Sequence, residues 1–582
     1  MATIRGAFAG RIGLSRRFGR LLIILLVGAL LGLADAGTVL AGSKWGPHID
    51  VHFKPGNKRT LGELDVFLPL WQDNRTMVFG NIRGQGDVAS NGEGNFGIGY
   101  RRLISGEWIV GAYAYFDVRR TRYGNRFVQG TLGLEALSVD WDFRANGYIP
   151  EPGAKRVDAL SMVEVSGSQI VIREGIERAL AGFDGEIGRR LPVDGVELRV
   201  YAGGYYFHAK GVQTVAGPRG RVEARFNDLE FAGGGTRLTI GLEAQWDRPR
   251  GGQVFAVIAL RIPLGGAAER ARRRALSPLE RRMTERVVRD VDIVSQEHHG
   301  GAEPALYDGR VISGIDTVDA GGDLKTTVEV ASAANGIVVV KGAVNVPLPV
   351  TMKQGQIIFG GGSAIALTGA RTGAVATFRA PGTAGAVTGG AAGIVLSAAN
   401  NTVIAGLAFS GGAQQISAIG VTGVVIRGTN HTIANGTQTA IVATNVTGLA
   451  VDGVSISGPG ALGTGISLSG VQGSITSTSI AGTQFGIAVA GTSSVALVGV
   501  NANNSAFGVF IWALGGGAAI DISIDASVMT GNGYAVVAIG SGGGTVALSG
   551  AGNTMSGSTT ANCFIAGPVT GAVGGTPQNC PP

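Results

Sequence analysis

Beyond its first 41 residues the chain contains no apolar run of about 18 residues, the length that a membrane-spanning helix needs. Charged residues are scarce, at 15% of the chain. The scarcity is greatest between Pro381 and Pro582, where only four side chains carry a formal charge: Arg427, Asp452, Asp521 and Asp525. The chain after residue 41 therefore offers no candidate for a spanning helix, and its apolar side chains are spread through short segments.

Motifs of common catalytic and metal sites are missing as well. The sequence has neither a GxSxG nucleophile elbow nor a P-loop. Its six histidines include one adjacent pair, His298 and His299, with no cysteine or further histidine nearby to complete a metal site. The sequence therefore predicts no cofactor and no metal.

The formal net charge of +7 does not indicate a nucleic-acid partner, because much of the excess lies at the N-terminus. Five basic residues precede the apolar stretch 21–33: Arg5, Arg11, Arg16, Arg17 and Arg20. A basic region, an apolar core and then small residues are typical of a secretory signal peptide. We expect this signal peptide to span residues 1–41, with cleavage after Ala36 or Ala41. A membrane anchor is the alternative, although the apolar run is short for a span.

The composition changes near residue 300. Residues 42–265 carry aromatic, charged and turn residues in regular alternation, whereas residues 301–582 are dominated by Gly, Ala, Ser, Thr, Val and Ile. Residues 266–300 join the two parts and contain the most arginine-dense stretch of the chain. The sequence therefore predicts two different architectures and a linker.

The first part alternates with a period of two. In VDWDFRANGYIP the apolar set is Val139, Trp141, Phe143 and Ala145, and the polar set is Asp140, Asp142, Arg144 and Asn146. Successive side chains of a β-strand point to opposite faces, so each set lies on one face. The same pattern recurs in RLTIGLEAQWDRP and QVFAVIALRIPLG. Short connections such as 248–252 imply antiparallel pairing.

Two folds are compatible with this alternation. A soluble β-sandwich buries the apolar face, whereas a membrane β-barrel turns it to lipid and lines its lumen with the polar face. The export signal, strands of about ten residues and aromatic residues near strand ends favour the barrel. The aromatic residues that would form an interfacial girdle are Trp108, Trp141, Tyr148, Tyr205 and Trp246.

Several ordered motifs resemble the β-domain of inverse autotransporters, the intimin and invasin family of outer-membrane proteins. They include GxGYR at 97–101, AYFD at 114–117 and NGYIP at 146–150, and the resemblance covers about 250 residues. It implies a barrel of twelve strands over residues 42–265, embedded in outer-membrane lipid and inserted with barrel-assembly and periplasmic chaperone machinery. It also implies that residues 301–582 are a passenger exported through the barrel to the cell surface.

The sequence of the linker is compatible with two structural interpretations. Leu276, Leu279, Met283 and Val287 fall at helical spacing, with arginines on the remaining surface. Either this is a solvated basic helix, or it lies in the barrel lumen with its arginines facing acidic wall residues, and the resemblance favours the lumen. The candidate arginines are Arg281, Arg282, Arg286 and Arg289, and the candidate acids are Asp140, Asp142, Glu243 and Asp247.

Short apolar cores recur in the second part at intervals of a little over 20 residues, as in GISLSG, GIAVAG and GVFIWA. Repeats of this length predict a right-handed parallel β-helix with Val, Ile, Leu and Ala stacked inside. The alternative, a disordered tract, is disfavoured by the many β-branched apolar residues. Cys563 and Cys580 are the only cysteines, and in an exported chain they form a candidate disulfide closing the last coil, with two free thiols as the alternative.

For the passenger we weigh three functions. The leading one is an adhesin-like module that binds an unknown host, matrix or cell-surface ligand, with Phe507, Phe510 and Trp512 as the candidate surface. The alternative is a surface-displayed, glycan-active β-helix enzyme, which would need clustered carboxylates. Asp521 and Asp525 share a strand face, but no third carboxylate or base accompanies them, so we predict no enzyme. The third function is a simple channel.

Overall fold

The computed structural model describes residues 44–229, 235–265, 271, 275–290, 292–390, 393–460, 462–576 and 580. The expected signal peptide, residues 1–41, lies outside these residues. The chain divides into two compact units. The barrel unit contains the residues up to Val157 and then Ile176–His298. The solenoid unit contains Asp158–Gly175 and His299–Pro582.

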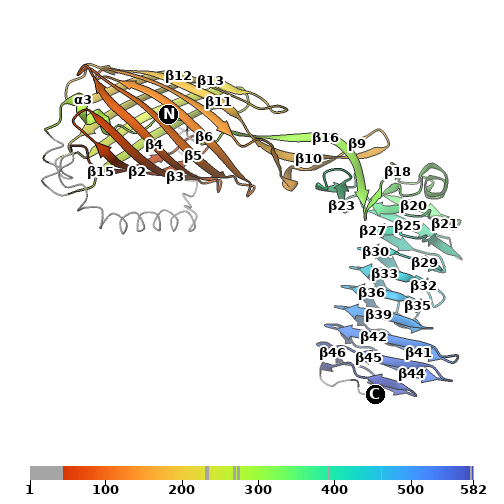
Figure 1. Ribbon diagram of the computed structural model, residues 1–582. Helices are drawn as coiled ribbons and strands as arrows, with labels where there is room; N and C mark the ends of the chain where they lie inside the picture. Colours follow the sequence, from red (N-terminus) through yellow and green to blue (C-terminus); the bar gives the residue numbers. More distant parts are fainter. Residues whose placement is uncertain are drawn as a thin grey trace, which may run out of the picture. The chain divides into compact units, whose positions relative to one another are not determined.

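The barrel unit is a closed barrel of twelve antiparallel strands, as the resemblance implies (Figure 1). Its strands are β1 (His48–Lys54), β2 (Leu61–Gln72), β3 (Thr76–Asp87), β4 (Gly92–Ile104), β5 (Trp108–Arg120), β6 (Arg126–Leu137), β7 (Trp141–Pro150), β11 (Ala181–Leu191), β12 (Glu197–His208), β13 (Val215–Asn227), β14 (Arg237–Asp247) and β15 (Gly251–Pro263). Pairing of β1 with β15, beginning at His48 opposite Pro263, closes the barrel and leaves no free edge.

The barrel wall is inverted relative to a soluble protein. In β7 the apolar residues Trp141, Phe143 and Ile149 are exposed on the outer surface, with Ile149 67% exposed, whereas Asp142 and Arg144 are buried inside. The same arrangement holds in β6, where Leu132 and Leu134 face outward and Glu135 faces inward. An apolar outer wall around a polar lumen suits a lipid surround, which is the barrel geometry and not the sandwich.

Two members of the expected aromatic girdle point the other way. Tyr148 and Tyr205 are buried in the lumen, where their hydroxyl groups donate to Asp184 and Asp247 at 2.7 and 2.8 Å. Trp246 is exposed on the outer wall, as expected. Strand parity decides the difference, because Tyr148 alternates with the outward residues of β7, and proximity to a strand end does not fix the face.

Among the described linker residues from 275 onward, helical structure is confined to residues 278–284. Helix α3 (Pro278–Arg281) begins at Ser277, whose side chain accepts from the Glu280 backbone while Glu280 reaches back to it, and η3 (Arg282–Thr284) follows. Residues 285–290 and 292–294 have no helical structure. The expected helix is therefore shorter than its apolar spacing suggested, and Val287 lies beyond its end.

The solenoid unit is built from three parallel sheets, each gaining one strand per turn (Figure 1). Sheet 1 contains β18 (Ile315–Asp319), β19 (Ile337–Lys341), β22 (Ile357–Gly360), β27 (Val403–Ala405), β30 (Val425–Arg427), β33 (Thr447–Asp452), β36 (Gln472–Thr476), β39 (Ser493–Val498), β42 (Ala519–Asp525), β45 (Thr545–Ser549) and β48 (Val569–Gly571). Sheet 2 contains β20 (Ala343–Val346), β25 (Gly385–Gly389), β28 (Leu407–Ser410), β31 (Asn430–Thr432), β34 (Ser455–Ser457), β37 (Ser479–Ala481), β40 (Asn501–Asn503), β43 (Val528–Thr530), β46 (Asn553–Ser556) and β49 (Gly575–Thr576).

Sheet 3 contains β21 (Val350–Thr351), β26 (Ile394–Ser397), β29 (Gln414–Ile419), β32 (Thr439–Thr444), β35 (Thr464–Ser469), β38 (Phe485–Ala490), β41 (Phe507–Leu514), β44 (Tyr534–Ser541) and β47 (Ala561–Ala566). Equivalent residues stack from turn to turn, as Ile466, Ile487 and Val509 do in the interior. The repeat pattern thus predicted the parallel β-solenoid correctly. Two short helical segments, α4 (Leu324–Thr326) and η4 (Thr327–Ala331), lie near its beginning.

A further sheet has seven strands. It contains β16 (Ser295–Tyr307), β17 (Arg310–Val311), β23 (Ala364–Gly369) and β24 (Val375–Arg379), together with β8 (Ala154–Arg156), β9 (Met162–Ser166) and β10 (Gln169–Ala179). The short helix η2 (Asp158–Leu160) precedes β9. Residues 158–175 fall between barrel strands β7 and β11 in sequence, yet they belong to the solenoid unit. The expected barrel range 42–265 did not separate this insertion.

Among the described residues no helix combines the length and apolar character that crossing a membrane requires.

Cys563 and Cys580 form a disulfide between β47 and the end of the chain. Cys580 is fully buried and its backbone pairs with Val573. A loop of this length stabilises a fold by about 3 kcal/mol. We expect replacement of both cysteines by serine to lower the stability of the last turn by about that amount, seen as proteolytic trimming of the C-terminal end. Reductant is expected to reproduce the effect in the unmodified chain and to leave the double variant unchanged; equal trimming of all samples would contradict this.

Candidate functional site

The first candidate site is the barrel lumen, which the linker occupies. Leu279, Met283 and Val287 are buried there in an apolar cluster with wall residues such as Phe79 and Tyr113. The indole nitrogen of Trp45 donates to the carbonyl of Glu280 at 2.8 Å. The apolar residues of the linker thus pack against lumen aromatics and fix α3 in place.

Wall side chains satisfy the backbone of the extended part of the linker. Arg101 donates to the carbonyls of Met283 and Glu285 at 2.9 and 2.6 Å, and Arg83 donates to that of Val287 at 2.9 Å. Further along, the backbone nitrogen of Asp290 lies 2.6 Å from the Tyr148 hydroxyl. Irregular backbone at membrane depth is tolerated only where protein or water satisfies it, and here the wall does so.

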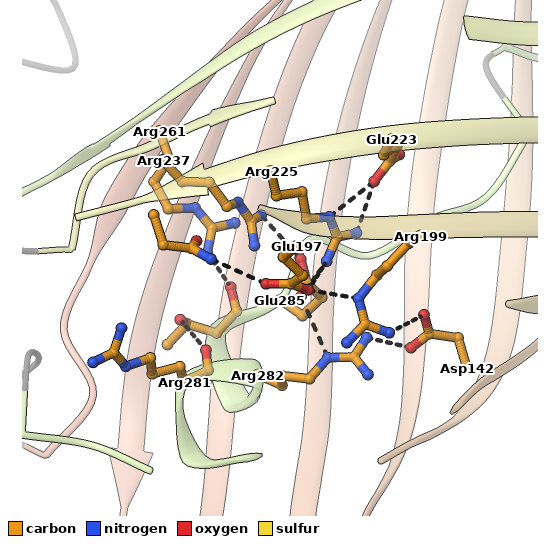
Figure 2. Close-up of polar contacts among 12 residues, drawn as sticks. Asp142, Glu197, Arg199, Glu223, Arg225, Arg237, Arg261, Arg281, Arg282 and Glu285 are labelled. Atoms are coloured by element: carbon orange, nitrogen blue, oxygen red, sulfur yellow. Dashed lines mark hydrogen bonds and ion pairs between the residues drawn. The ribbon is translucent and has the colours of Figure 1, made fainter. Parts of the chain in front are cut away.

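Buried ion pairs join the linker to the wall, and Figure 2 shows those around Glu285. Glu285 pairs with Arg237 at 2.9 Å and with Arg225 at 3.2 Å, and its neighbour in the linker, Arg282, lies 3.6 Å away. Arg282 also pairs with Asp142, which Arg199 contacts at 3.0 Å. One linker carboxylate is therefore surrounded by three guanidinium groups.

The remaining linker charges pair in the same way. Arg286 contacts Glu63, and Arg289 pairs with Asp117 at 3.0 Å. Asp292 pairs with Arg59 at 2.7 Å and with Arg119 at 3.2 Å. The linker thus presents both signs of charge, and each sign finds the opposite one on the wall. These ion pairs dock the described part of the linker against the lumen wall.

The structure brings together some of the sequence-predicted residues and not others. Arg282 and Asp142 meet. Arg281 instead pairs with Asp228 near the surface at 2.6 Å, and Asp140 is exposed. Glu243 pairs with Lys54 of the wall at 3.3 Å, and Asp247 pairs with Arg250 at 2.7 Å. The alternation fixed which residues face the lumen, but it gave no angular position around the barrel.

Sequence reasoning missed the acidic residues of the linker. Glu285, Asp290 and Asp292 all pair with wall arginines. The signal was the mixed-charge stretch ERVVRDVD, in which acids and arginines are interleaved. The sequence-based prediction considered only the arginines of this stretch and so did not include its acidic residues.

The second candidate site is an aromatic patch on sheet 3, formed by Phe485, Phe507, Phe510, Trp512, Tyr534 and Phe564. Phe485, Phe507 and Tyr534 stack along successive turns, with ring centroids 5.1 and 5.7 Å apart. Phe510 meets Phe485 and Phe507 edge-on at 5.1 and 5.2 Å. Parallel in-register strands create this ladder, because each residue lies directly beside its counterpart in the next turn.

The patch is accessible and uncharged. Trp512 and Phe564 are 43% and 45% exposed, whereas Phe507 and Phe510 are half-buried. No strand of sheet 3 contains a charged residue. Large exposed apolar patches on soluble domains commonly mark binding sites. The sequence-predicted set named three members of the patch but not the flanking Tyr534 and Phe564.

Asp521 and Asp525 lie on β42 of sheet 1 and not on the sheet of the aromatic patch. Asp525 accepts a hydrogen bond from the backbone of Ala551 at 2.9 Å, so it holds a corner between turns. Asp521 is exposed. Within the residues that the structure describes, no group of three or more His, Cys, Asp or Glu side chains is placed to hold a metal ion.

A buried histidine, His431, is the basis for an expected acid sensitivity of the solenoid. His431 is 2% exposed, stacks on Phe409 at 5.1 Å, and lies 2.8 Å from Gln415 through Nδ1 and 3.0 Å from Thr429 through Nε2. Because Gln415 presents its amide oxygen, Nδ1 donates to it and Nε2 accepts from the Thr429 hydroxyl. Burial lowers the pKa of His431 to about 3.

Between about pH 3 and pH 6.5, His431 is therefore protonated in the unfolded chain and neutral in the folded solenoid. We expect the contribution of His431 to solenoid stability to be fully present above its ordinary pKa of 6.5 and to fall as the pH drops toward 3, by about 2 kcal/mol at pH 5. We expect His431→Gln to flatten this dependence. The measurement is the urea concentration at the midpoint of solenoid unfolding. It is monitored by circular dichroism on the full chain in detergent, at pH 7.5 and at pH 5. Parallel pH dependences in the two chains would argue against His431 as the cause.

Comparisons with known proteins agree with this architecture. Residues 46–212 match the model of the family described as inverse autotransporter, beta-domain. The comparison with curated proteins gives no match.

Three solved structures show similarity to parts of the chain. The β-domain of the Bordetella autotransporter Brka is 14% identical, covers 37% of this chain and 98% of its own, and has a TM-score of 0.22. The translocator domain of autotransporter NalP from Neisseria meningitidis is 8% identical, covers 44% and 100%, and has a TM-score of 0.22. The catalytic domain of a GH87 α-1,3-glucanase in complex with nigerose is 10% identical, covers 72% and 83%, and has a TM-score of 0.29. All three TM-scores lie below 0.5, so none of these likenesses bears on activity or ligand.

Proposed function

Because the chain joins an inverse autotransporter β-domain to a C-terminal β-solenoid, we propose that the solenoid is a surface-displayed binding module of adhesin type. The barrel lies in the bacterial outer membrane and exports the solenoid, which is exposed at the cell surface. What the solenoid does there is the proposed part. It binds a ligand on a host, matrix or neighbouring cell.

The aromatic patch on sheet 3 carries this proposal. It places six aromatic side chains on four successive strands, β38, β41, β44 and β47. Aromatic residues are enriched in the central parts of binding interfaces, where they supply large contact area at a low entropic cost. Since sheet 3 carries no charge, the ligand surface is recognised by stacking, apolar contact and neutral hydrogen bonds.

The proposal assigns no catalytic role to the solenoid. Asp521 and Asp525 lie on another sheet than the patch, and Asp525 has a structural role at a corner. A glycan-cleaving site would need an acid and a base facing the same bound sugar. We expect Asp521→Asn to leave adhesion unchanged.

Adhesion of bacteria that display the chain is the direct test. Cells carrying Trp512→Ala with Phe564→Ala are compared with unmodified cells on immobilised polysaccharides, matrix proteins and cell layers. The control is Val498→Ala, which removes an exposed apolar side chain, 41% exposed, from sheet 1. Loss of adhesion in the aromatic variant alone supports the proposal. Unchanged adhesion, with equal display of all three chains, would contradict it.

Display is measured by digestion of intact cells. Between residues 381 and 582 the chain contains one basic residue, Arg427, so trypsin has almost no sites there. Proteinase K and labelling of a tag in the solenoid are the suitable probes. A solenoid that remained inaccessible on intact cells would contradict export.

A further inference from the structure

The first turns of the solenoid are apolar on both faces. In β19, residues 337–340 are all buried, and in β22, residues 357–360 are all buried. Val338, Val340 and Ile358 point into the solenoid core. The alternate residues Ile337, Val339, Ile357 and Phe359 belong to a second apolar cluster on the opposite face.

Later turns differ in this respect. In β42 buried residues such as Ile520 and Ile522 alternate with more exposed ones such as Asp521 and Ser523, so only the inner face is apolar. The outer face of the first turns therefore needs a cover that the later turns do not need. Without it, the side chains of Ile337 and Phe359 would meet water.

Part of this cover comes from the insertion between barrel strands β7 and β11. The hairpin formed by β9 and β10 contributes Ile170 and Ile172 to the second cluster, and they are 2% and 0% exposed. Val163 packs against the same cluster. The other covering strands are β16, which begins at the end of the linker, and β23 and β24, which follow it in sequence.

Backbone contacts fix the hairpin against the beginning of sheet 1. The carbonyl oxygen of Ser168, in the turn of the hairpin, accepts from the backbone nitrogen of Ile315 at 2.8 Å. Ile315 is the first residue of β18, and β18 pairs directly with β19. His299 lies 3.1 Å from the carbonyl oxygen of Leu160. The hairpin is thus bonded where the solenoid begins.

The hairpin can form before the solenoid. Ser166 pairs with Gln169 across a two-residue turn, and Gly167 has a φ of 63°, which glycine adopts without strain. Its contacts are local and it precedes the solenoid in the chain. The solenoid turns instead pair residues about 20 positions apart, such as Ile466 and Ile487, and so close longer loops.

We propose that the hairpin 162–173, although inserted in the sequence of the barrel, is the template on which the exported solenoid begins to fold. It presents a preformed strand edge and two isoleucines, and the first turns bury their outer face against them. Folding then propagates turn by turn, as it does in other repeat architectures. This proposal depends on the export of the solenoid described above.

Ile172→Asp tests the template because it places a carboxylate in the second cluster. The matched control is Val165→Asp, in the other strand of the same hairpin, where Val165 is 46% exposed. After induction of the full chain, three properties are followed on intact cells: heat-modifiable migration of the barrel, labelling of a C-terminal tag, and the half-time for proteinase K resistance. We expect Ile172→Asp to be inserted and labelled normally, with a half-time about tenfold longer or more. Val165→Asp is expected to behave as the unmodified chain.

If the Ile172→Asp chain became resistant to proteinase K with the same half-time as the unmodified chain, the template proposal would be overturned. Should that variant yield no heat-modifiable barrel, Ile172→Ala serves instead, since it removes contacts without adding charge. Its half-time is then expected to be about twofold to threefold longer, and an unchanged half-time would overturn the proposal. Absence of tag labelling in the unmodified chain would contradict export itself, which is a different outcome from slow folding of a labelled chain.

Discussion

Replacing Glu285 by alanine is expected to release the linker from the barrel lumen. The change leaves Arg225, Arg237 and Arg282 without the carboxylate that they share, in a lumen where all three are largely shielded from water. Arg225 keeps Glu223 and Arg282 keeps Asp142, whereas Arg237 loses its contact with Glu285. Removing one partner from a buried charge network costs about 3–5 kcal/mol, because a buried charge loses its compensation. The barrel wall itself stays intact, since its strands pair through backbone hydrogen bonds.

Ion conductance across a planar lipid bilayer measures this release. The unmodified barrel is expected to conduct little because the linker fills the lumen, and Glu285→Ala is expected to open frequently. Glu280→Ala is the control, because Glu280 lies on the same linker and its carboxylate contacts the partly exposed Lys44 and the backbone nitrogen of Ser277. Equal conductance of the two variants would show that Glu285 does not hold the linker in place.

The second large effect is expected from Ile487→Asp in the solenoid core. Ile487 is fully buried in β38, stacked between Ile466 and Val509 of the neighbouring turns. A carboxylate at this position has no partner in the apolar stack, so we expect a loss of more than about 4 kcal/mol. Because each turn contacts mainly its neighbours, the damage is expected to spread through the adjacent turns first.

Proteinase K digestion of intact cells provides the measurement for this variant, with the mass of the protected fragment showing how far the damage extends. Ala488→Asp is the control, since it is the next residue of the same strand and lies on the outer face. Cleavage near residue 487 in the Ile487→Asp chain alone is the expected result. Full protection of both chains would show that the interior of sheet 3 tolerates charge.

Much of the fold was predictable because short-range periodicity reports which face of a strand is apolar. Trp141 and Phe143 alternate with Asp142 and Arg144, and the structure places these two pairs on opposite sides of the barrel wall. The repeated cores in the second part predicted stacked parallel strands for a similar reason. In both cases the information lies within a few neighbouring residues.

Contacts between residues far apart in the sequence were not predictable. Around the barrel, strand register and tilt decide which wall residue meets which linker residue. Arg282 therefore meets the predicted Asp142, whereas Arg289 meets Asp117, which no sequence pattern singled out. The hairpin of residues 162–173 shows the same limit, because alternation identifies a strand without identifying the sheet that receives it.

The absence of charge from sheet 3 has a consequence for the conditions under which the solenoid works. Attraction between charged surfaces weakens as dissolved ions accumulate, with a range of about 8 Å at physiological ionic strength. A ligand held by aromatic stacking has no such attraction to lose. Contact made through Trp512 and its neighbours would therefore persist from fresh water to brine, at the cost of forgoing the long-range steering that speeds encounters between oppositely charged partners.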